Sequence, residues 1–224
     1  MSYSWNTFDD TIRHILEITQ PQKVLDVGAG QGKYGKLIRQ FDLASTRVTA
    51  VECDPALQAS LLAEGGYADV WPITAQQLLD RPSETYDMVI MGDVIEHLKH
   101  SDGRDLLEFL NYRATFIMIV TPECMPMNLG VFYEGHNSLW RPDSFAWHDR
   151  WAHQRCGVMH FYLLRGLINI EGPTLGSVVE HLNRAGLSAE HHTTGALVPI
   201  NLEIHDTVYR EPDGKGGLTQ YRSD

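Results

Sequence analysis

The sequence predicts an α/β fold, with a Rossmann-like, mostly parallel sheet and helices on both of its faces. Three observations predict it. Short apolar segments alternate with amphipathic ones up to Val120. A glycine-rich turn, Gly-Ala-Gly-Gln-Gly, follows the first apolar segment. A length of 224 residues with 43% hydrophobic content suits a single domain, which we place at residues 1–210.

The first expected element is a helix that ends near Pro21. Asn6 or Thr7 can cap its start. Its apolar residues recur with the helical period, and they are Phe8, Ile12, Ile15 and Leu16.

The glycine-rich turn joins the first strand, Val24 to Val27, to a second helix. Gly28, Gly30 and Gly32 let the backbone adopt positive φ and approach a ligand closely. The helix directs its N-terminal amides at that ligand, and its apolar side chains are Leu37, Ile38 and Phe41. The turn therefore predicts a nucleotide-like cofactor at the end of the first strand.

Two further strand–helix units continue the alternation. Strands are expected at 47–52 and 70–73, and each precedes a helix, at 54–65 and 75–79 respectively. Proline near the first turn of the longer helix and a glycine pair after its last turn mark its ends.

The next two strands, 86–91 and 115–120, are apolar enough to be buried on both faces. Helical patterns at 93–98 and 104–111 lie between them. Right-handed crossovers bring the carboxyl ends of these strands, and so the ligand crevice, to one edge of the sheet.

The pattern loosens after Pro122. A loop at 123–141, rich in Met, Gly, Asn and aromatic residues, is long enough to act as a substrate lid. Residues 211–224 are expected to be a flexible tail. The remaining elements are expected as helices at 142–151 and 174–184 and as strands around 157–170 and 187–204.

Charge and composition exclude several kinds of partner. The net charge is −11, from 29 acidic and 18 basic residues, and no run of Lys or Arg occurs. This argues against a nucleic-acid surface and favours a small-molecule substrate. No apolar run approaches the roughly 20 residues of a membrane span, the N-terminus lacks signal-peptide features, and three scattered cysteines predict no disulfide framework. We therefore expect a cytoplasmic protein.

Asp26 indicates which cofactor binds, because it lies inside the first strand, two residues before Gly28. Gly30, Gly32 and Gly35 fit the dinucleotide fingerprint G-x-G-x-x-G. A carboxylate at this place would repel a pyrophosphate and attract a cofactor that carries an ammonium and a sulfonium group. A tight strand-to-helix turn with a capping Asp is the simpler alternative.

The segment Val-Leu-Asp-Val-Gly-Ala-Gly-Gln-Gly, at 24–32, resembles the first motif of class I S-adenosylmethionine (SAM) methyltransferases. The resemblance covers roughly residues 22–150 and implies the class I methyltransferase fold. It also implies that Asp26 and the three glycines of the turn hold the methionine part of SAM.

Glu52 ends the second strand, where such folds use a carboxylate to accept hydrogen bonds from ribose hydroxyls. Either SAM or NAD would use it, and a solvated strand-end glutamate is the alternative. By resemblance, Cys53 would pack near the adenine ring. Thr74 or Ala75 occupies the position where the family often has an acidic residue that accepts a hydrogen bond from the adenine amino group.

A second motif, Gly-Asp-Val-Ile-Glu-His-Leu at 92–98, follows the fourth strand. The spacing of Asp93, Glu96 and His97 puts them on one face of a helical turn, which would look into the crevice. Asp-x-x-Glu is also a capping box, but capping alone does not account for His97.

This second motif resembles that of ubiquinone-pathway O-methyltransferases and small-RNA 2′-O-methyltransferases. In those families an acidic residue, a Glu and a His hold a divalent metal ion with a His from a later loop. The resemblance implies Asp93, Glu96 and His97 as ligands, with His136 as the fourth, and two carboxylates with two imidazoles suit Mg²⁺, Mn²⁺, Fe²⁺ or Zn²⁺. The alternative for His136 is a loop histidine packed on Trp140. Without a metal, either histidine could act as a general base.

The sequence thus predicts a SAM-dependent methyltransferase that acts on a hydroxyl of a small molecule, with Asp93, His97 and His136 at the reacting groups. Two alternatives stay open. An NAD(P)-dependent oxidoreductase would explain the glycines and Glu52 but not Asp26 or the group from Asp93 to His97. A methyltransferase-like binding subunit without catalysis would retain the fold alone.

Overall fold

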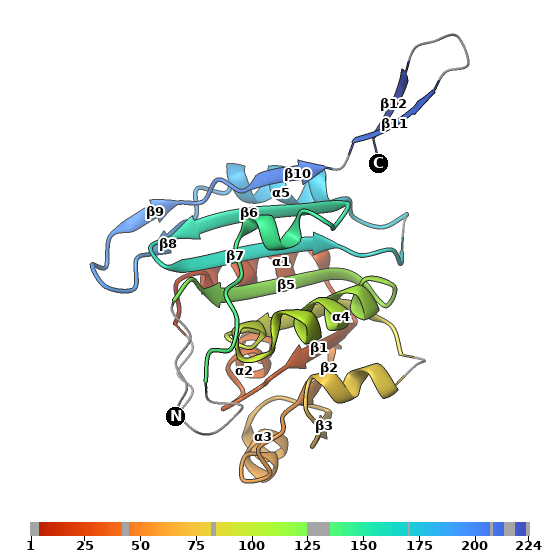
Figure 1. The fold of residues 1–224 in the computed structure, drawn as a ribbon. Helices are drawn as coiled ribbons and strands as arrows, with labels where there is room; N and C mark the ends of the chain where they lie inside the picture. Colours follow the sequence, from red (N-terminus) through yellow and green to blue (C-terminus); the bar gives the residue numbers. More distant parts are fainter. Residues whose placement is uncertain are drawn as a thin grey trace.

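The central feature is an eight-stranded sheet with helices on both faces (Figure 1). The computed structural model describes residues 5–41, 45–81, 84–124, 135–169, 171–206, 208–212 and 218–222. The strands of the sheet are β1 (Lys23–Val27), β2 (Arg47–Val51), β3 (Asp69–Trp71), β4 (Tyr86–Gly92), β5 (Ala114–Pro122), β6 (Arg150–Cys156), β7 (Met159–Arg165) and β10 (Glu203–Asp206). Their order is β10-β6-β7-β5-β4-β1-β2-β3. Strands β1 to β5 run parallel, and β7 runs antiparallel to both β5 and β6.

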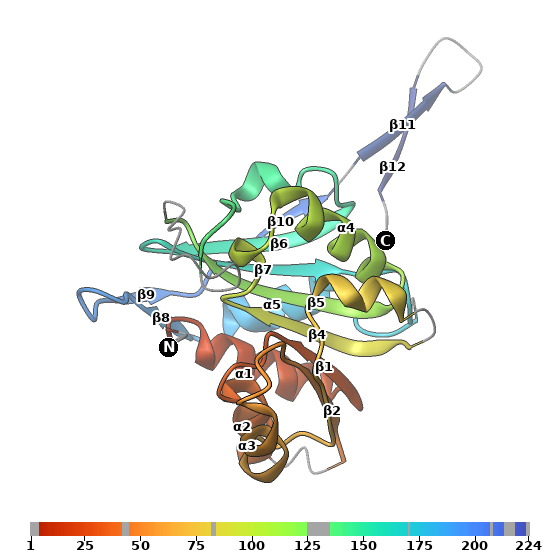
Figure 2. The ribbon, with the colours of Figure 1, turned by 60° about the horizontal axis from the view of Figure 1, so that its bottom comes forward.

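Helices cover the two faces of the sheet unequally (Figures 1 and 2). One face packs against α1 (Asp9–Thr19), α2 (Lys33–Gln40), α3 (Gln58–Glu64) and α5 (Leu175–Arg184). The other packs against α4 (His100–Asn111) and the 3₁₀ helix η1 (Gln76–Asp80). Neighbouring residues of a strand enter different cores, as Val24 and Leu25 do. The predicted mostly parallel sheet with helices on both faces is confirmed.

Strand register positions the candidate site. Asp26 of β1 pairs with Ala50 of β2 and Ile90 of β4, and Val27 pairs with Val51 and Met91. All these strands are parallel, so their carboxyl ends meet at one edge. The sheet order changes direction between β1 and β4, which makes that edge the expected ligand crevice.

One predicted element after Pro122 is wrong. In place of a helix over 142–151, the chain forms a short 3₁₀ helix, η3 (Pro142–Phe145), and then enters β6 at Arg150. The side chain of Trp151 is 5% exposed and packs beside Phe145 and Tyr162, with ring centroids 5.9 and 6.0 Å apart. Burial of this ring in the sheet outweighs the local helical pattern.

The remaining elements lie toward the C-terminus and around the fourth strand. They are η2 (Ile95–His97), β8 (Ser188–Glu190), β9 (Leu197–Pro199), β11 (Val208–Pro212) and β12 (Leu218–Arg222). The expected tail includes most of the β11–β12 hairpin, which projects from the sheet (Figure 1). Residues 125–134, most of the expected lid, lie outside the described residues.

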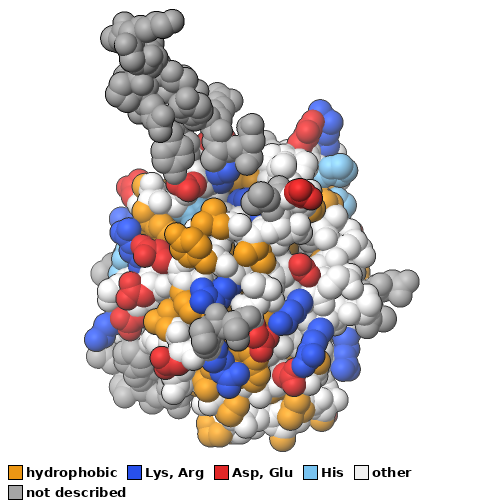
Figure 3. Space-filling model, turned by 90° about the vertical axis from the view of Figure 1, so that its right-hand side faces the viewer, with side chains coloured by type: hydrophobic (Ala, Val, Ile, Leu, Met, Phe, Trp, Pro, Cys, Tyr) orange, Lys and Arg blue, Asp and Glu red, His pale blue; other side chains and the backbone are white. Residues whose placement is uncertain are grey.

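The surface carries charges of both signs. On the face shown in Figure 3, lysine and arginine side chains are interspersed with aspartate and glutamate side chains. Within the described ranges, no helix is both long and apolar enough to cross a membrane.

We expect Gly35→Ala to destabilise the fold, although alanine normally favours a helix. A Cβ at Gly35 in α2 would collide with the carbonyl oxygen of Gly65 and lie 2.5 Å from Cζ of Tyr67. Overpacking of this kind costs about 1–3 kcal/mol. The matched control is Gly176→Ala in α5, where the nearest atom is Oγ1 of Thr174 at 3.9 Å, and where alanine should stabilise by up to about 1 kcal/mol. Urea unfolding of both variants measures the difference, and equal effects would contradict this packing account.

Candidate active site

The glycine turn begins where β1 ends. Gly28 and Gly30 have φ of 71° and 52°, which glycine adopts without strain. A Cβ on Gly28 would collide with the side chain of Val94, whereas a Cβ on Gly30 would find no atom closer than 3.9 Å. The turn is therefore tightly packed at its start and open at Gly30, so a ligand could approach the backbone at Gly30.

The amides of the turn donate hydrogen bonds within the protein. Gly28 and Ala29 both donate to the carbonyl of Val51, at 2.8 and 3.1 Å, and Gly32 donates to the carbonyl of Ala29 at 2.8 Å. The amide of Gly30 donates to the carboxylate of Glu52, as described next. These four amides are thus already used before any ligand binds.

Glu52 closes the site from the end of β2. Its Oε2 accepts from the amide of Gly30 at 2.7 Å, and its Oε1 accepts from the amide of Asp54 at 2.8 Å. The side chain is largely buried. The predicted ribose-binding carboxylate therefore lies directly against the glycine turn, with further acceptor lone pairs on both oxygens.

Asp26 is fully buried beneath the turn. Its Oδ2 accepts a hydrogen bond of 2.5 Å from the hydroxyl of Tyr67, and Oδ1 has no hydrogen-bond partner among the residues described. Burial raises the pKa of Asp26 to about 7, the hydrogen bond from Tyr67 lowers it, and the nearby charge of Glu52 raises it. The carboxyl group therefore titrates near neutral pH, where its charged and neutral forms are both populated.

The residues expected around the adenine follow the next two strands. Cys53 is half-buried, and burial followed by the charge of Glu52 raises the pKa of its thiol. The amide of Thr74 donates a hydrogen bond to Oε1 of Gln77 at 2.8 Å, and Ala75 directly precedes η1. The carboxyl ends of β2 and β3 bring these residues to the same edge of the sheet as Glu52.

The motif after β4 does not form the expected helical turn. Only Ile95–His97 is helical, as the 3₁₀ helix η2, and its N-cap residue is Val94. Asp93 lies before the cap with φ of 53°, a left-handed conformation that aspartate tolerates. Its amide donates to the carbonyl of Val120, and Glu96 accepts from Oγ1 of Thr121 at 2.9 Å. The capping-box alternative is therefore wrong, as is a shared helical face that begins at Asp93.

Glu96 is 1% exposed. Burial raises its pKa well above the ordinary value, and the charge of Asp93 raises it further. The buried hydroxyl of Thr121, at the end of β5, partly offsets this effect. Two carboxyl groups thus lie close together at the end of β4, where a cation would stabilise their charged forms.

The segment that carries His136 is held against η2 by backbone and side-chain hydrogen bonds. The amides of Asn137 and Ser138 donate to the carbonyl of Glu96 at 2.7 and 3.1 Å. The indole N–H of fully buried Trp140 donates to the carbonyl of Ile95 at 3.1 Å. These bonds fix the position of His136 beside Glu96, although forty residues separate them in the chain.

Glu96, His97 and His136 each present one ligand atom within 4.8 Å of the others. His97 donates from Nδ1 to the carbonyl of Gly135 at 3.1 Å, which leaves the lone pair on Nε2, 4.0 Å from Oε1 of Glu96. Burial lowers the pKa of both histidines, which keeps them neutral as metal ligands must be. Three of the four predicted ligands are brought together, and this donor set fits a divalent metal ion. Asp93 is not part of the three-residue group.

Two of the residues in this site were not predicted from the sequence. They are Tyr67, which holds Asp26, and Thr121, which holds Glu96. A polar residue at the end of an otherwise apolar strand was the available signal for Thr121. Tyr67 follows a glycine pair in a loop, and nothing local links it to β1.

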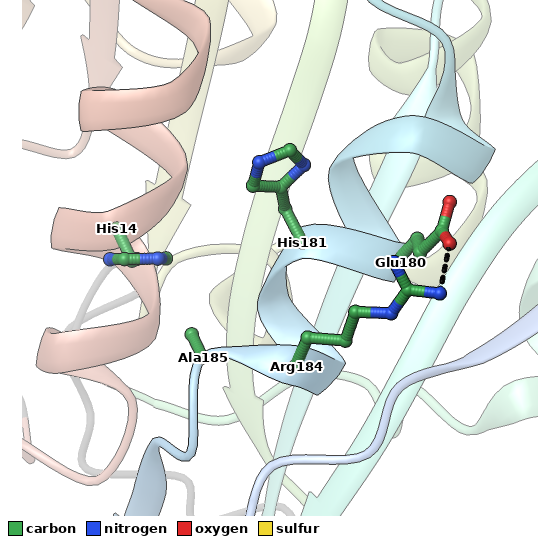
Figure 4. A pocket seen from close by; sticks show the side chains of 5 residues that line it. All are labelled: His14, Glu180, His181, Arg184 and Ala185. Carbon is green, nitrogen blue, oxygen red and sulfur yellow. Dashed lines mark ion pairs between the residues drawn. The ribbon is translucent and has the colours of Figure 1, made fainter.

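A separate surface hollow of about 390 Å³ lies between α1 and α5 (Figure 4). Its lining side chains are His14, Glu180, His181, Arg184 and Ala185, and Glu180 pairs with Arg184 at 2.7 Å. None of the predicted site residues lines it. The hollow is therefore distinct from the candidate active site.

Comparison with known proteins agrees with this geometry. Residues 25–111 match the family described as a methyltransferase domain. The fold is similar to the methyltransferase domain of bacterial CtHen1-C (TM-score 0.54, 14% identity, covering 72% of this chain and 98% of that one). It is also similar to a SAM-dependent methyltransferase from Archaeoglobus fulgidus (TM-score 0.53, 14% identity, covering 70% of this chain and 94% of that one). A third similar structure is the PH0226 protein from Pyrococcus horikoshii (TM-score 0.55, 11% identity, covering 72% of this chain and 89% of that one). No protein of curated function matches the sequence significantly. The predicted resemblance to class I methyltransferases and the predicted fold class are confirmed.

We expect Asp26→Asn to stabilise the ligand-free protein more at pH 8 than at pH 5. The Asp26 carboxyl has a pKa of about 7 when folded and an ordinary value of 3.8 when unfolded. Between these values the unfolded chain releases a proton that the folded protein keeps, so the free energy of unfolding falls as pH rises and levels off above pH 7. Asparagine does not titrate, so it removes this loss of stability. The increase in the free energy of unfolding that the substitution causes should therefore be larger at pH 8 than at pH 5 by roughly 2–3 kcal/mol.

Urea unfolding at the two pH values measures this difference. Asp105→Asn, at an exposed position of α4, is the control and should change stability equally at both. A gain from Asp26→Asn that does not depend on pH would contradict the assignment of a buried, titrating carboxyl group.

Proposed function

We propose that this chain, which has the class I methyltransferase fold, is a SAM-dependent methyltransferase. The observation that carries the proposal is the hydrogen bond of 2.7 Å from the Gly30 amide to the carboxylate of Glu52. It puts a negative charge against the open side of the glycine turn. A pyrophosphate would need free amides there, and Glu52 already occupies the amide of Gly30. A nucleoside with ribose hydroxyls and positive groups would be attracted.

The charges around the turn favour the same cofactor. Asp26, Glu52, Asp93 and Glu96 lie at the carboxyl edge of the parallel strands, where burial raises the pKa of Glu96 and the charge of Asp93 raises it further. A bound cation would stabilise the charged forms of these carboxyl groups and be attracted by them, and SAM carries an ammonium and a sulfonium group. Glu52 would hold the ribose, and Asp26 would contribute its charge from beneath the turn.

The acceptor would lie beside His97 and His136, whose rings meet edge to face with centroids 5.0 Å apart. The reaction would be an in-line transfer of the methyl group from sulfonium to an oxygen of a small molecule, so the residues mainly need to orient the acceptor. A neutral imidazole of either histidine could take the hydroxyl proton. A divalent metal ion held by Glu96, His97 and His136 would lower the pKa of an acceptor hydroxyl.

We expect the wild-type protein to bind S-adenosylhomocysteine (SAH) and SAM but not NADH, as measured by calorimetry. Glu52→Gln should weaken SAH binding by about tenfold or more, because the amide NH₂ of glutamine cannot accept a hydrogen bond from a ribose hydroxyl and the negative charge is lost. Glu64→Gln, at an exposed position of α3, is the matched control and should leave binding unchanged. Binding of NADH without SAH would favour the oxidoreductase alternative. Binding of SAH without turnover on any acceptor would favour the non-catalytic subunit.

We expect His136→Ala and Glu96→Ala each to abolish methyl transfer and to remove binding of Mn²⁺ in calorimetric titrations, because each takes one ligand from the group of three. SAM affinity should stay within a few-fold of wild type, since neither side chain belongs to the glycine turn. His181→Ala, in α5 away from this site, is the control and should bind Mn²⁺ as wild type does. Turnover that persists in excess EDTA would remove the metal from the proposal.

A further inference from the structure

Tyr67 occupies a space that two glycines, Gly32 and Gly35, leave open. It follows Gly65-Gly66 in the loop between α3 and β3, and its side chain is 4% exposed. A Cβ on Gly35 would lie 2.5 Å from Cζ of the ring, and a Cβ on Gly32 would lie 3.3 Å from Cε2. The ring therefore fits directly beneath the start of α2, against the glycine turn.

The hydroxyl of Tyr67 makes two hydrogen bonds at the end of this ring. It accepts from the amide of Gly35 at 3.1 Å and donates to Oδ2 of Asp26 at 2.5 Å. The amide of Gly35 belongs to the first turn of α2, where amides lack helical acceptors. The hydroxyl thus connects the start of α2 to the carboxylate inside β1.

We propose that Tyr67 is a positioning residue for SAM binding, whose hydroxyl orients the Asp26 carboxyl group beneath the glycine turn and stabilises its charged form. This inference rests on the proposed function, since it concerns the charge that the cofactor would meet. It assigns a role in cofactor binding to a loop that lies outside the glycine motif.

The groups that face Asp26 come from three elements. Tyr67 lies after α3, and Glu52 lies after β2. Tyr34 lies in α2, where burial raises the pKa of its phenol and the charges of Asp93, Asp9 and Asp26 raise it further. Burial and Glu52 favour the protonated carboxyl, whereas the hydrogen bond from Tyr67 favours the charged one. Loss of this hydroxyl would therefore raise the pKa of Asp26 further and leave the carboxyl neutral at neutral pH.

The test is the pH profile of SAH affinity for Tyr67→Phe, measured by calorimetry between pH 6 and pH 8.5. Phenylalanine keeps the ring and its packing but removes the hydroxyl. Affinity at pH 7 should fall by about tenfold, because Asp26 without this hydrogen bond is largely neutral and offers less negative charge to the ligand. The loss should shrink toward pH 8.5, where Asp26 ionises again. Tyr86→Phe is the matched control, a buried tyrosine at the start of β4, and should keep the wild-type profile.

A double variant separates this role from a packing effect. In an Asp26→Asn background, Tyr67→Phe should change SAH affinity no further. Equal weakening at every pH, or a wild-type profile in Tyr67→Phe, would overturn the inference and leave the proposed function intact. Wild-type protein that binds no SAH would contradict the proposed function itself. Should Tyr67→Phe not fold, replacing Tyr67 by 3-fluorotyrosine, a stronger donor, should move the midpoint of the profile to lower pH, and an unmoved midpoint would overturn the inference.

Discussion

The buried carboxyl group of Asp26 is the constraint on which the proposed cofactor site depends. Taking a carboxylate out of water costs several kcal/mol unless hydrogen bonds or opposite charges compensate it. Within the described part of the chain, one hydrogen bond from Tyr67 supplies that compensation, and the pKa stays near 7. A group kept at such a cost, beside an open glycine turn, is more useful for binding than for stability.

Strand register makes this carboxyl group inseparable from the sheet. Asp26 pairs with Ala50 and Ile90, whose side chains fill the same core, whereas Leu25 and Val27 fill the opposite one. A slip of one residue would exchange the two cores and bury Asp26 under α4 instead. The apolar neighbours of Asp26 therefore fix where its charge lies, and the site cannot shift without unfolding the centre of the sheet.

The proposed acceptor half of the site is built differently, by backbone hydrogen bonds between η2 and the segment that carries His136. Glu96 and His97 lie in a short 3₁₀ helix, and the segment with His136 attaches to it through the amides of Asn137 and Ser138. Burial of Trp140 against this helix adds the apolar part of the contact. Because β5, α4 and loops separate the two segments in the chain, only the folded structure brings their imidazoles together.

The sequence by itself determined the alternation of strands and helices, the glycine turn with Asp26 and Glu52, and the likeness of two motifs to methyltransferases. These features depend on local periodicity and on residues a few positions apart, and a local sequence pattern contains this information. Tertiary structure alone decided that Asp93 lies outside η2, that Trp151 enters a strand, and that Tyr67 meets Asp26. Each of these depends on contacts with segments that are distant in the chain, such as the bond from the Asp93 amide to the carbonyl of Val120, and no local pattern contains such contacts.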